Sequence, residues 1–164
     1  MYRKLNNDNI VKYIGSEIVS NQFCIYLEYM SGGSIQMIYQ QQTSGQLPEE
    51  TIKLYTRQIL SGISYLHSNK VVHCDLKGAN VLVDDATQRV KLTDFGCAKL
   101  FESSISHSDM NGAIRGSLAW MAPEVLMNKG IRRKADIWSL GCLVIEMAVG
   151  GNPWGSELFA GNNF

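Results

Sequence analysis

A long amphipathic segment follows Pro48. Its apolar residues recur at spacings of three and four, which places them on one face of an α-helix: Ile52, Tyr55, Ile59, Ile63 and Leu66. Proline suits the first position of a helix, and the acids Glu49 and Glu50 behind it suit the positive end of the helix dipole. We therefore predict a long helix that packs one face against a core.

A second helix is predicted from Lys134 to Val149, where apolar residues occupy nearly every side. A helix that is apolar all round is expected to be a buried, central one. Its strongly apolar run, 137–145, ends at Glu146, far short of the roughly 20 residues that cross a bilayer. We therefore expect no membrane span.

Short runs rich in β-branched and aromatic residues predict strands at 10–14, 23–27, 71–72, 81–83 and 90–93. The turn-prone residues 20–22 predict that the first two strands form an antiparallel pair, and the polar segment 84–89 predicts a turn between the last two. A Ser-Gly-Gly-Ser break occupies 31–34. The polar stretch 100–116 predicts a mobile surface loop.

The composition fits one domain, with 164 residues of which 45% are apolar. Fifteen basic and 15 acidic residues cancel, which argues against a general nucleic-acid binder. The cysteines are too far apart in sequence for a Cys-x-x-Cys metal site: Cys24, Cys74, Cys97 and Cys142. No signal-peptide pattern opens the sequence, so we expect a cytoplasmic protein with reduced thiols.

Three short motifs occur in a fixed order. They are His73-Cys74-Asp75 with Lys77 and Asn80, then Asp94-Phe95-Gly96, then Ala122-Pro123-Glu124. Together they resemble the signature of the protein kinase family. Segments 77–82, 94–99 and 116–124 are most similar to serine/threonine kinases of the MAP kinase kinase kinase type, in the Ste group.

The resemblance implies an α+β, protein-kinase-like two-lobe fold in truncated form. Residues 1–27 would be a remnant of the small β lobe, with the end of one helix and two strands. Residues 28–164 would hold the hinge and most of the helical large lobe, including the catalytic loop, the activation segment and the central helix. No linker that would separate two independent domains is visible.

The resemblance also implies the chemistry, which is transfer of the γ-phosphate of ATP to a serine or threonine of a protein such as a MAP kinase kinase. Asp75 would accept the proton of the substrate hydroxyl, and Lys77 would lie near the transferred phosphate. Asn80 and Asp94 would hold Mg²⁺ through hard oxygen ligands. The alternative for all four residues is ordinary hydrogen bonding in turns and caps.

The nucleotide site is implied in the same way. Leu27 would be the gatekeeper behind the adenine, and the hinge that follows it would hydrogen-bond the base. The residues assigned to ATP are Leu27, Glu28, Met30, Ser34, Leu82 and Asp94. Leu82 and Ile35 would form the floor beneath the ring.

Two further roles are structural. His73 would pack with Phe95 and Tyr13 in an internal apolar column rather than act as a base. Asp136, at the start of the second predicted helix, would anchor the backbone of the catalytic loop.

The chain departs from the family at Cys74, where most members have an arginine that pairs with a phosphorylated residue. Cysteine offers phosphate no charged donor, although five serine hydroxyls are available for phosphorylation: Ser103, Ser104, Ser106, Ser108 and Ser117. Nothing in the chain resembles the Gly-rich loop, the ATP-binding lysine or the arginine that would pair with Glu124. We therefore expect a fragment with weak or no activity alone, or alternatively an inactive remnant that acts as a protein-binding module.

Overall fold

The structure is a computed structural model and describes residues 2–100 and 117–155. Its helices and strands, in chain order, are β1 (Tyr13–Val19), β2 (Gln22–Leu27), α1 (Ile35–Gln41), α2 (Glu49–Ser68), β3 (Val71–Val72), β4 (Val81–Asp84), β5 (Arg89–Leu92), β6 (Lys99–Leu100), α3 (Pro123–Leu126) and α4 (Arg133–Val149). Short 3-10 turns at Gly78–Asn80, Phe95–Cys97 and Leu118–Trp120 lie between them.

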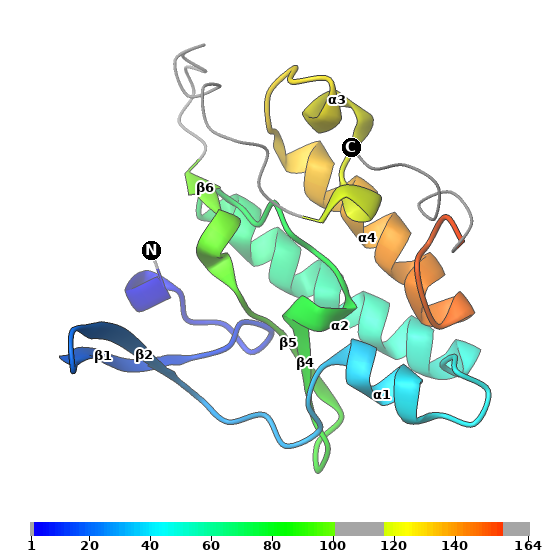
Figure 1. Ribbon diagram of the computed structural model, residues 1–164, viewed down its shortest axis with the longest axis horizontal. Coiled ribbons are helices and arrows are strands. Elements are labelled where there is room, and N and C mark those ends of the chain that lie inside the picture. Colours follow the sequence, from blue (N-terminus) through cyan, green and yellow to red (C-terminus); the bar gives the residue numbers. More distant parts are fainter. Residues whose placement is uncertain (1, 101–116, 156–164) are drawn as a thin grey trace.

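Both predicted long helices are confirmed, and they lie side by side (Figure 1). The α2 helix contacts β5 as well as α4, and it buries the predicted face at Tyr55, Ile59, Ile63 and Leu66. Pro48 stands one position earlier than predicted, as the N-cap residue. The core forms where α1, α2, α4 and the β4–β5 hairpin meet.

The α4 helix is not buried all round, so that prediction is wrong. One face is buried and includes Asp136, Leu143 and Met147, whereas Ile137 is 50% exposed and Val149 is 58% exposed. The reason is geometric: within residues 2–100 and 117–155, α4 packs mainly against α1, α2 and the 3-10 turns Gly78–Asn80 and Leu118–Trp120, which leave its other face exposed. No helix in these residues is long and apolar enough to cross a membrane.

The first antiparallel pair forms as predicted, but β1 lies later in the sequence than expected. Ser20 and Asn21, with φ of 49° and 64°, make the tight turn that pairs 15–19 with 22–26. Ile10 instead bridges to Leu92 beside β5 and is buried there. Figure 1 shows the β1–β2 hairpin reaching away from the helices.

The remaining short strands pair as β4 with β5, around the predicted polar turn, and as β3 with β6. Helix α1 was not predicted, because Ser34 was interpreted only as part of a chain break. Its hydroxyl oxygen accepts a hydrogen bond from Met37 N at 3.2 Å and caps the helix. The predicted loop at 100–116 begins one residue too early, since Leu100 belongs to β6; its other residues lie outside those described.

Candidate active site

Loop 73–80, between β3 and β4, is anchored to the first turn of α4. The carboxylate of Asp136 accepts hydrogen bonds from the main-chain N–H groups of His73 and Cys74, each at 3.0 Å. His67 Nε2 lies 2.7 Å from Asp136 Oδ2. Asp136 is fully buried and holds the loop as the resemblance implied, whereas sequence reasoning missed His67.

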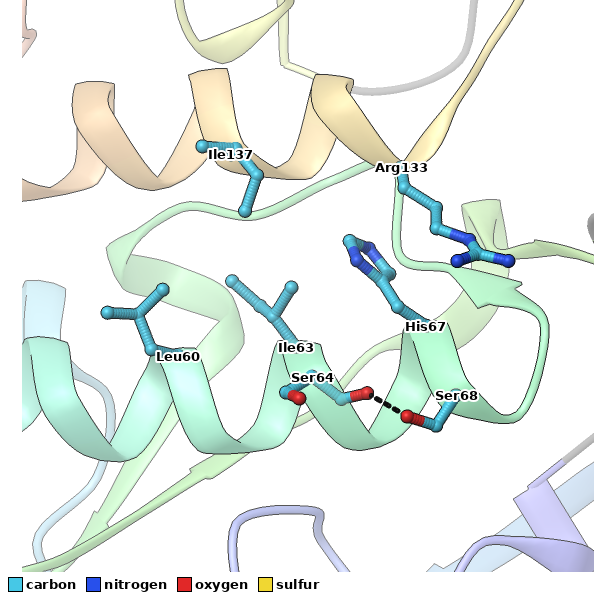
Figure 2. Close-up of a pocket in the computed structure, with 7 residues that line it drawn as sticks. All are labelled: Leu60, Ile63, Ser64, His67, Ser68, Arg133 and Ile137. Atoms are coloured by element: carbon cyan, nitrogen blue, oxygen red, sulfur yellow. Dashed lines mark hydrogen bonds between the residues drawn. The ribbon is translucent and has the colours of Figure 1, made fainter.

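His67 also lines a pocket between α2 and α4. Figure 2 shows its ring between the helices, beside Arg133, with Leu60 and Ile63 along the same face of α2. The other lining residues are Ser64, Ser68 and Ile137. The predicted site residues do not line this pocket, so it is separate from the candidate active site.

Asp75, Lys77 and Asn80 converge within this loop. The Asn80 side-chain amide donates to the main-chain oxygen and to Oδ2 of Asp75, both at 2.9 Å. Lys77 Nζ lies 3.5 Å from Asp75 Oδ2. The 3-10 turn over Gly78–Asn80 brings position 80 back to position 75, and the Asp75 side chain is largely buried.

Asp94 lies two residues after the end of β5, beside this loop. Thr93 N donates to Asn80 O at 3.0 Å, and the His73 ring lies 5.1 Å from the Phe95 ring between centroids. Asp94 itself has φ of 58°, and its carboxylate accepts a hydrogen bond from Gly96 N at 3.2 Å. The residues on either side of Asp94 are therefore tied to the loop that carries Asp75 and Asn80.

The His73 ring is fully buried and behaves as the predicted packing residue. Burial lowers its pKa against the raising effect of Asp136, Thr93 O and the nearby carboxylates. A neutral ring whose Nε2 lies 3.0 Å from Thr93 O is suited to packing between loop and strand. Tyr13, the other predicted member of the column, lies at the start of β1, and its place beside His73 stays a prediction.

The oxygen donors of Asn80 and Asp94 fit Mg²⁺ by their chemistry. Asn80 uses both amide hydrogens on Asp75, which leaves Oδ1 for a cation. Within residues 2–100 and 117–155, no three His, Cys, Asp or Glu side chains gather as a metal site. Mg²⁺ suits such a sparse set, because it usually keeps water and binds substrate phosphates beside one or two protein ligands.

Ser117 is a site residue that sequence reasoning missed. Lys77 Nζ donates to Ser117 Oγ at 2.6 Å, and Ser117 N donates to Asp75 Oδ1 at 2.9 Å. The sequence analysis named this hydroxyl only as available for phosphorylation. Its segment, 116–124, was already singled out, but no spacing pattern could reveal a contact across 40 residues.

The start of the predicted hinge, Glu28, is held by contacts with Lys91 and Lys12. Lys91 Nζ lies 2.7 and 2.8 Å from the two carboxylate oxygens of Glu28, and Glu28 N donates to Lys12 O at 3.0 Å. Met30 is buried, and Leu27 is half-buried. The half-buried Leu82 bridges to Ser34, whose hydroxyl is used in capping α1; a direct role for Ser34 toward ATP stays a prediction.

Cys74 has a left-handed backbone, with φ of 69°, and its thiol lies 3.5 Å from Val72 O. Burial, helped by the charge of Asp136, raises the pKa of the thiol to about 12. Because the thiolate is the reactive form, a thiol with this pKa is expected to be unreactive. Glu124 is half-buried and forms no ion pair within the described part of the chain.

Comparison with known proteins gives the same family for the domain model and for the similar proteins. A model of the protein kinase domain matches residues 1–161. Mitogen-activated protein kinase kinase kinase A of Dictyostelium discoideum is 45% identical over 152 residues, covering 93% of this chain and 16% of that protein. The kinase YODA of Arabidopsis thaliana is 50% identical over 152 residues, covering 92% and 16%.

Mitogen-activated protein kinase kinase kinase 19 of Mus musculus is similar over 95% of this chain, at 46% identity over 159 residues, and the match covers 12% of that protein. The chain therefore spans only 12 to 16% of the length of these three relatives.

Proposed function

The chain belongs to the protein kinase family, and on that premise we propose that the protein containing it is an ATP-dependent serine/threonine kinase of the MAP kinase kinase kinase type. The observation that carries this proposal is the arrangement around Asp75. One carboxylate oxygen accepts from Asn80 Nδ2 and the other from Ser117 N, which fixes the carboxylate. A carboxylate held in one orientation is what a base for a substrate hydroxyl requires.

The neighbouring residues have complementary roles in this proposal. Lys77 brings a positive charge to the side of Asp75 where the transferred phosphate would lie. Asn80 and Asp94 would hold Mg²⁺, which when bound neutralises charge on the phosphates. Leu27 as the gatekeeper and the hinge residues Glu28 and Met30, with Ser34 and Leu82, would bind the adenine end of ATP.

The acceptor in this proposal is a protein serine or threonine. The names of the relatives, which describe kinases that act on MAP kinase kinases, support a MAP kinase kinase as substrate. The proposed location is the cytoplasm.

The test measures transfer of labelled γ-phosphate from Mg²⁺-ATP by the full-length protein. Asp75→Asn, which keeps the shape but not the charge, should lower the rate at least about a hundredfold. Asp8→Asn, at an exposed carboxylate, is the matched control. Label on serine or threonine supports the proposal, whereas transfer to tyrosine alone, or an Asp75→Asn variant as active as wild type, contradicts it. A stable complex with another kinase but no turnover would favour the binding-module alternative.

A further inference from the structure

Glu146, on α4, is an acidic residue in the core that the roles assigned above do not use. It is 1% exposed. Its Oε1 accepts a hydrogen bond from Tyr39 Oη at 3.0 Å, and its Oε2 accepts from Gly78 N at 2.9 Å and Trp120 Nε1 at 2.8 Å. One carboxylate therefore joins α1, loop 73–80 and the 3-10 turn Leu118–Trp120.

Stability alone does not account for an acid at this position. Burial raises the pKa of Glu146, and the three hydrogen bonds and the charge of Lys77 act in the opposite direction. Replacing buried charged groups by well-packed apolar residues is often neutral or stabilising. A buried carboxylate held by three donors thus points to a geometric role.

The contacts of Glu146 close a ring around Asp75. Gly78 follows Lys77, which donates to Ser117 Oγ, and Ser117 N donates to Asp75. Trp120 follows Ser117 by one 3-10 turn and returns to Glu146. The α4 helix holds this turn at a second point, where Ser139 Oγ donates to Trp120 O at 2.7 Å.

Gly78 is required by this ring. A Cβ at position 78 would lie 2.5 Å from Glu146 Oε1 and 3.0 Å from its Cδ. A side chain at position 78 would therefore displace the carboxylate from its place against the main-chain N–H of Gly78.

We propose that Glu146 is a positioning residue for phosphoryl transfer, which keeps Lys77 and Ser117 in register beside Asp75 by bridging Gly78 and Trp120. This inference rests on the proposed kinase function. Because Glu146 acts through other residues, its loss should affect the transfer step and not the binding of ATP.

The test uses the full-length protein, with phosphate transfer to myelin basic protein as the probe. Glu146→Gln keeps the side-chain volume but places an amide N–H donor among groups that themselves donate to the carboxylate. Trp120→Phe removes the Nε1 donor. Each should lower kcat about tenfold with KM for ATP within about twofold, the effect expected of one lost hydrogen bond to a charged group. The double variant should be no slower than the slower single one, since both remove the same link.

Tyr39→Phe is the matched control, because it removes a hydrogen bond from the same carboxylate without touching loop 73–80 or the turn 118–120. Its kcat should stay within about twofold of wild type. The proposal is overturned if Glu146→Gln and Trp120→Phe keep the wild-type kcat, or if Tyr39→Phe loses as much as they do. If Glu146→Gln fails to fold, the comparison of kcat between Trp120→Phe and Tyr39→Phe tests the proposal by itself.

Hydrogen–deuterium exchange separates this inference from the proposed function, since it needs no activity. Glu146→Gln should speed exchange in segments 75–80 and 117–120, and Tyr39→Phe should not. Equal exchange in the two variants overturns the positioning role even if the wild type is an active kinase. If the wild type transfers no phosphate, the kinase function is contradicted. The exchange result then still shows whether Glu146 holds segments 75–80 and 117–120 in place.

Discussion

The main-chain N–H of Cys74 donates to Oδ1 of Asp136 over 3.0 Å, which ties loop 73–80 to the first turn of α4. The other oxygen of the same carboxylate accepts from His73 N and lies 2.7 Å from His67 Nε2. Asp136 is fully buried, so these contacts are the environment of its charge. The loop that carries Asp75 therefore depends on an acid 61 positions further along the chain.

Replacing Asp136 by Asn should destabilise the protein by about 3 kcal/mol, because the variant loses a charged acceptor and turns an amide toward donors. A hydrogen bond to a charged group contributes about 1.5–3 kcal/mol. Urea denaturation measures the loss. Asp8→Asn, whose exposed carboxylate lies 3.9 Å from Arg89, should cost less than about 0.5 kcal/mol. Equal losses in the two variants would refute an anchoring role for Asp136.

Ser117→Ala should lower kcat about tenfold, because Lys77 loses the acceptor at 2.6 Å that holds it beside Asp75. Ser117→Thr keeps a hydroxyl and should retain most of the activity. Ser117→Asp should be inactive, since it brings a second negative charge to Asp75. Steady-state kinetics check all three. An active Ser117→Asp variant would instead support an activating phosphorylation at this position.

Sequence patterns were sufficient for features set by local periodicity and by motifs. The α2 face, the turn at Ser20 and Asn21, and the β4–β5 hairpin all follow from neighbouring residues. The α1 helix was missed because its seven residues are too few for a clear period, and its only start signal is the cap at Ser34. The exposed apolar face of α4 was missed because the apolar character of a helix does not show which of its faces pack against another element.

Within the candidate site, the sequence predicted which residues lie together but not how they are held. Asp75, Lys77 and Asn80 lie on one short loop, so their convergence follows from local geometry. Ser117 and Glu146 also contact that loop, although they lie 39 and 68 positions after Gly78 in the sequence. Such contacts depend on the path of the chain in space, and no residue spacing predicts them.

Cys74 should resist alkylation in the folded protein. Its thiol pKa is raised to about 12, so almost none of it is thiolate at neutral pH, and the thiolate is the reactive form. Native treatment with iodoacetamide at pH 7.5, followed by peptide mass spectrometry, should leave position 74 unmodified. The same treatment in urea should modify it fully. Rapid native modification would contradict the packing seen here.

The stability of the protein should fall as pH drops below about 6.5, through His73. Burial lowers the pKa of this ring in the folded state, so the unfolded chain binds the proton more readily and acid favours unfolding. One proton contributes at most about 1.4 kcal/mol per pH unit. Glu146, whose pKa is raised by burial, changes stability in the opposite direction, and it is present in both wild type and the His73→Gln variant compared with it.

His73→Gln is the comparison that isolates this effect, since glutamine can still donate to Thr93 O but does not titrate. Urea midpoints at pH 7.5 and 5.5 should differ less in His73→Gln than in wild type. The same acid dependence in both proteins would assign the effect to other groups.

Asn80→Asp separates metal binding from positioning. If a better Mg²⁺ ligand were all that position 80 required, a carboxylate should serve at least as well, because carboxylates are preferred ligands of this ion. The structure predicts the opposite. The Asn80 amide donates to the main-chain oxygen and to Oδ2 of Asp75, so aspartate would replace two donations by a like charge against Asp75. We expect kcat to fall at least about a hundredfold, whereas the Mg²⁺ concentration that gives half the maximal rate should be lower or unchanged.

Steady-state kinetics across Mg²⁺ concentrations measure both quantities. A variant that keeps the wild-type kcat would mean that Asp75 does not need the amide of Asn80 to hold its orientation.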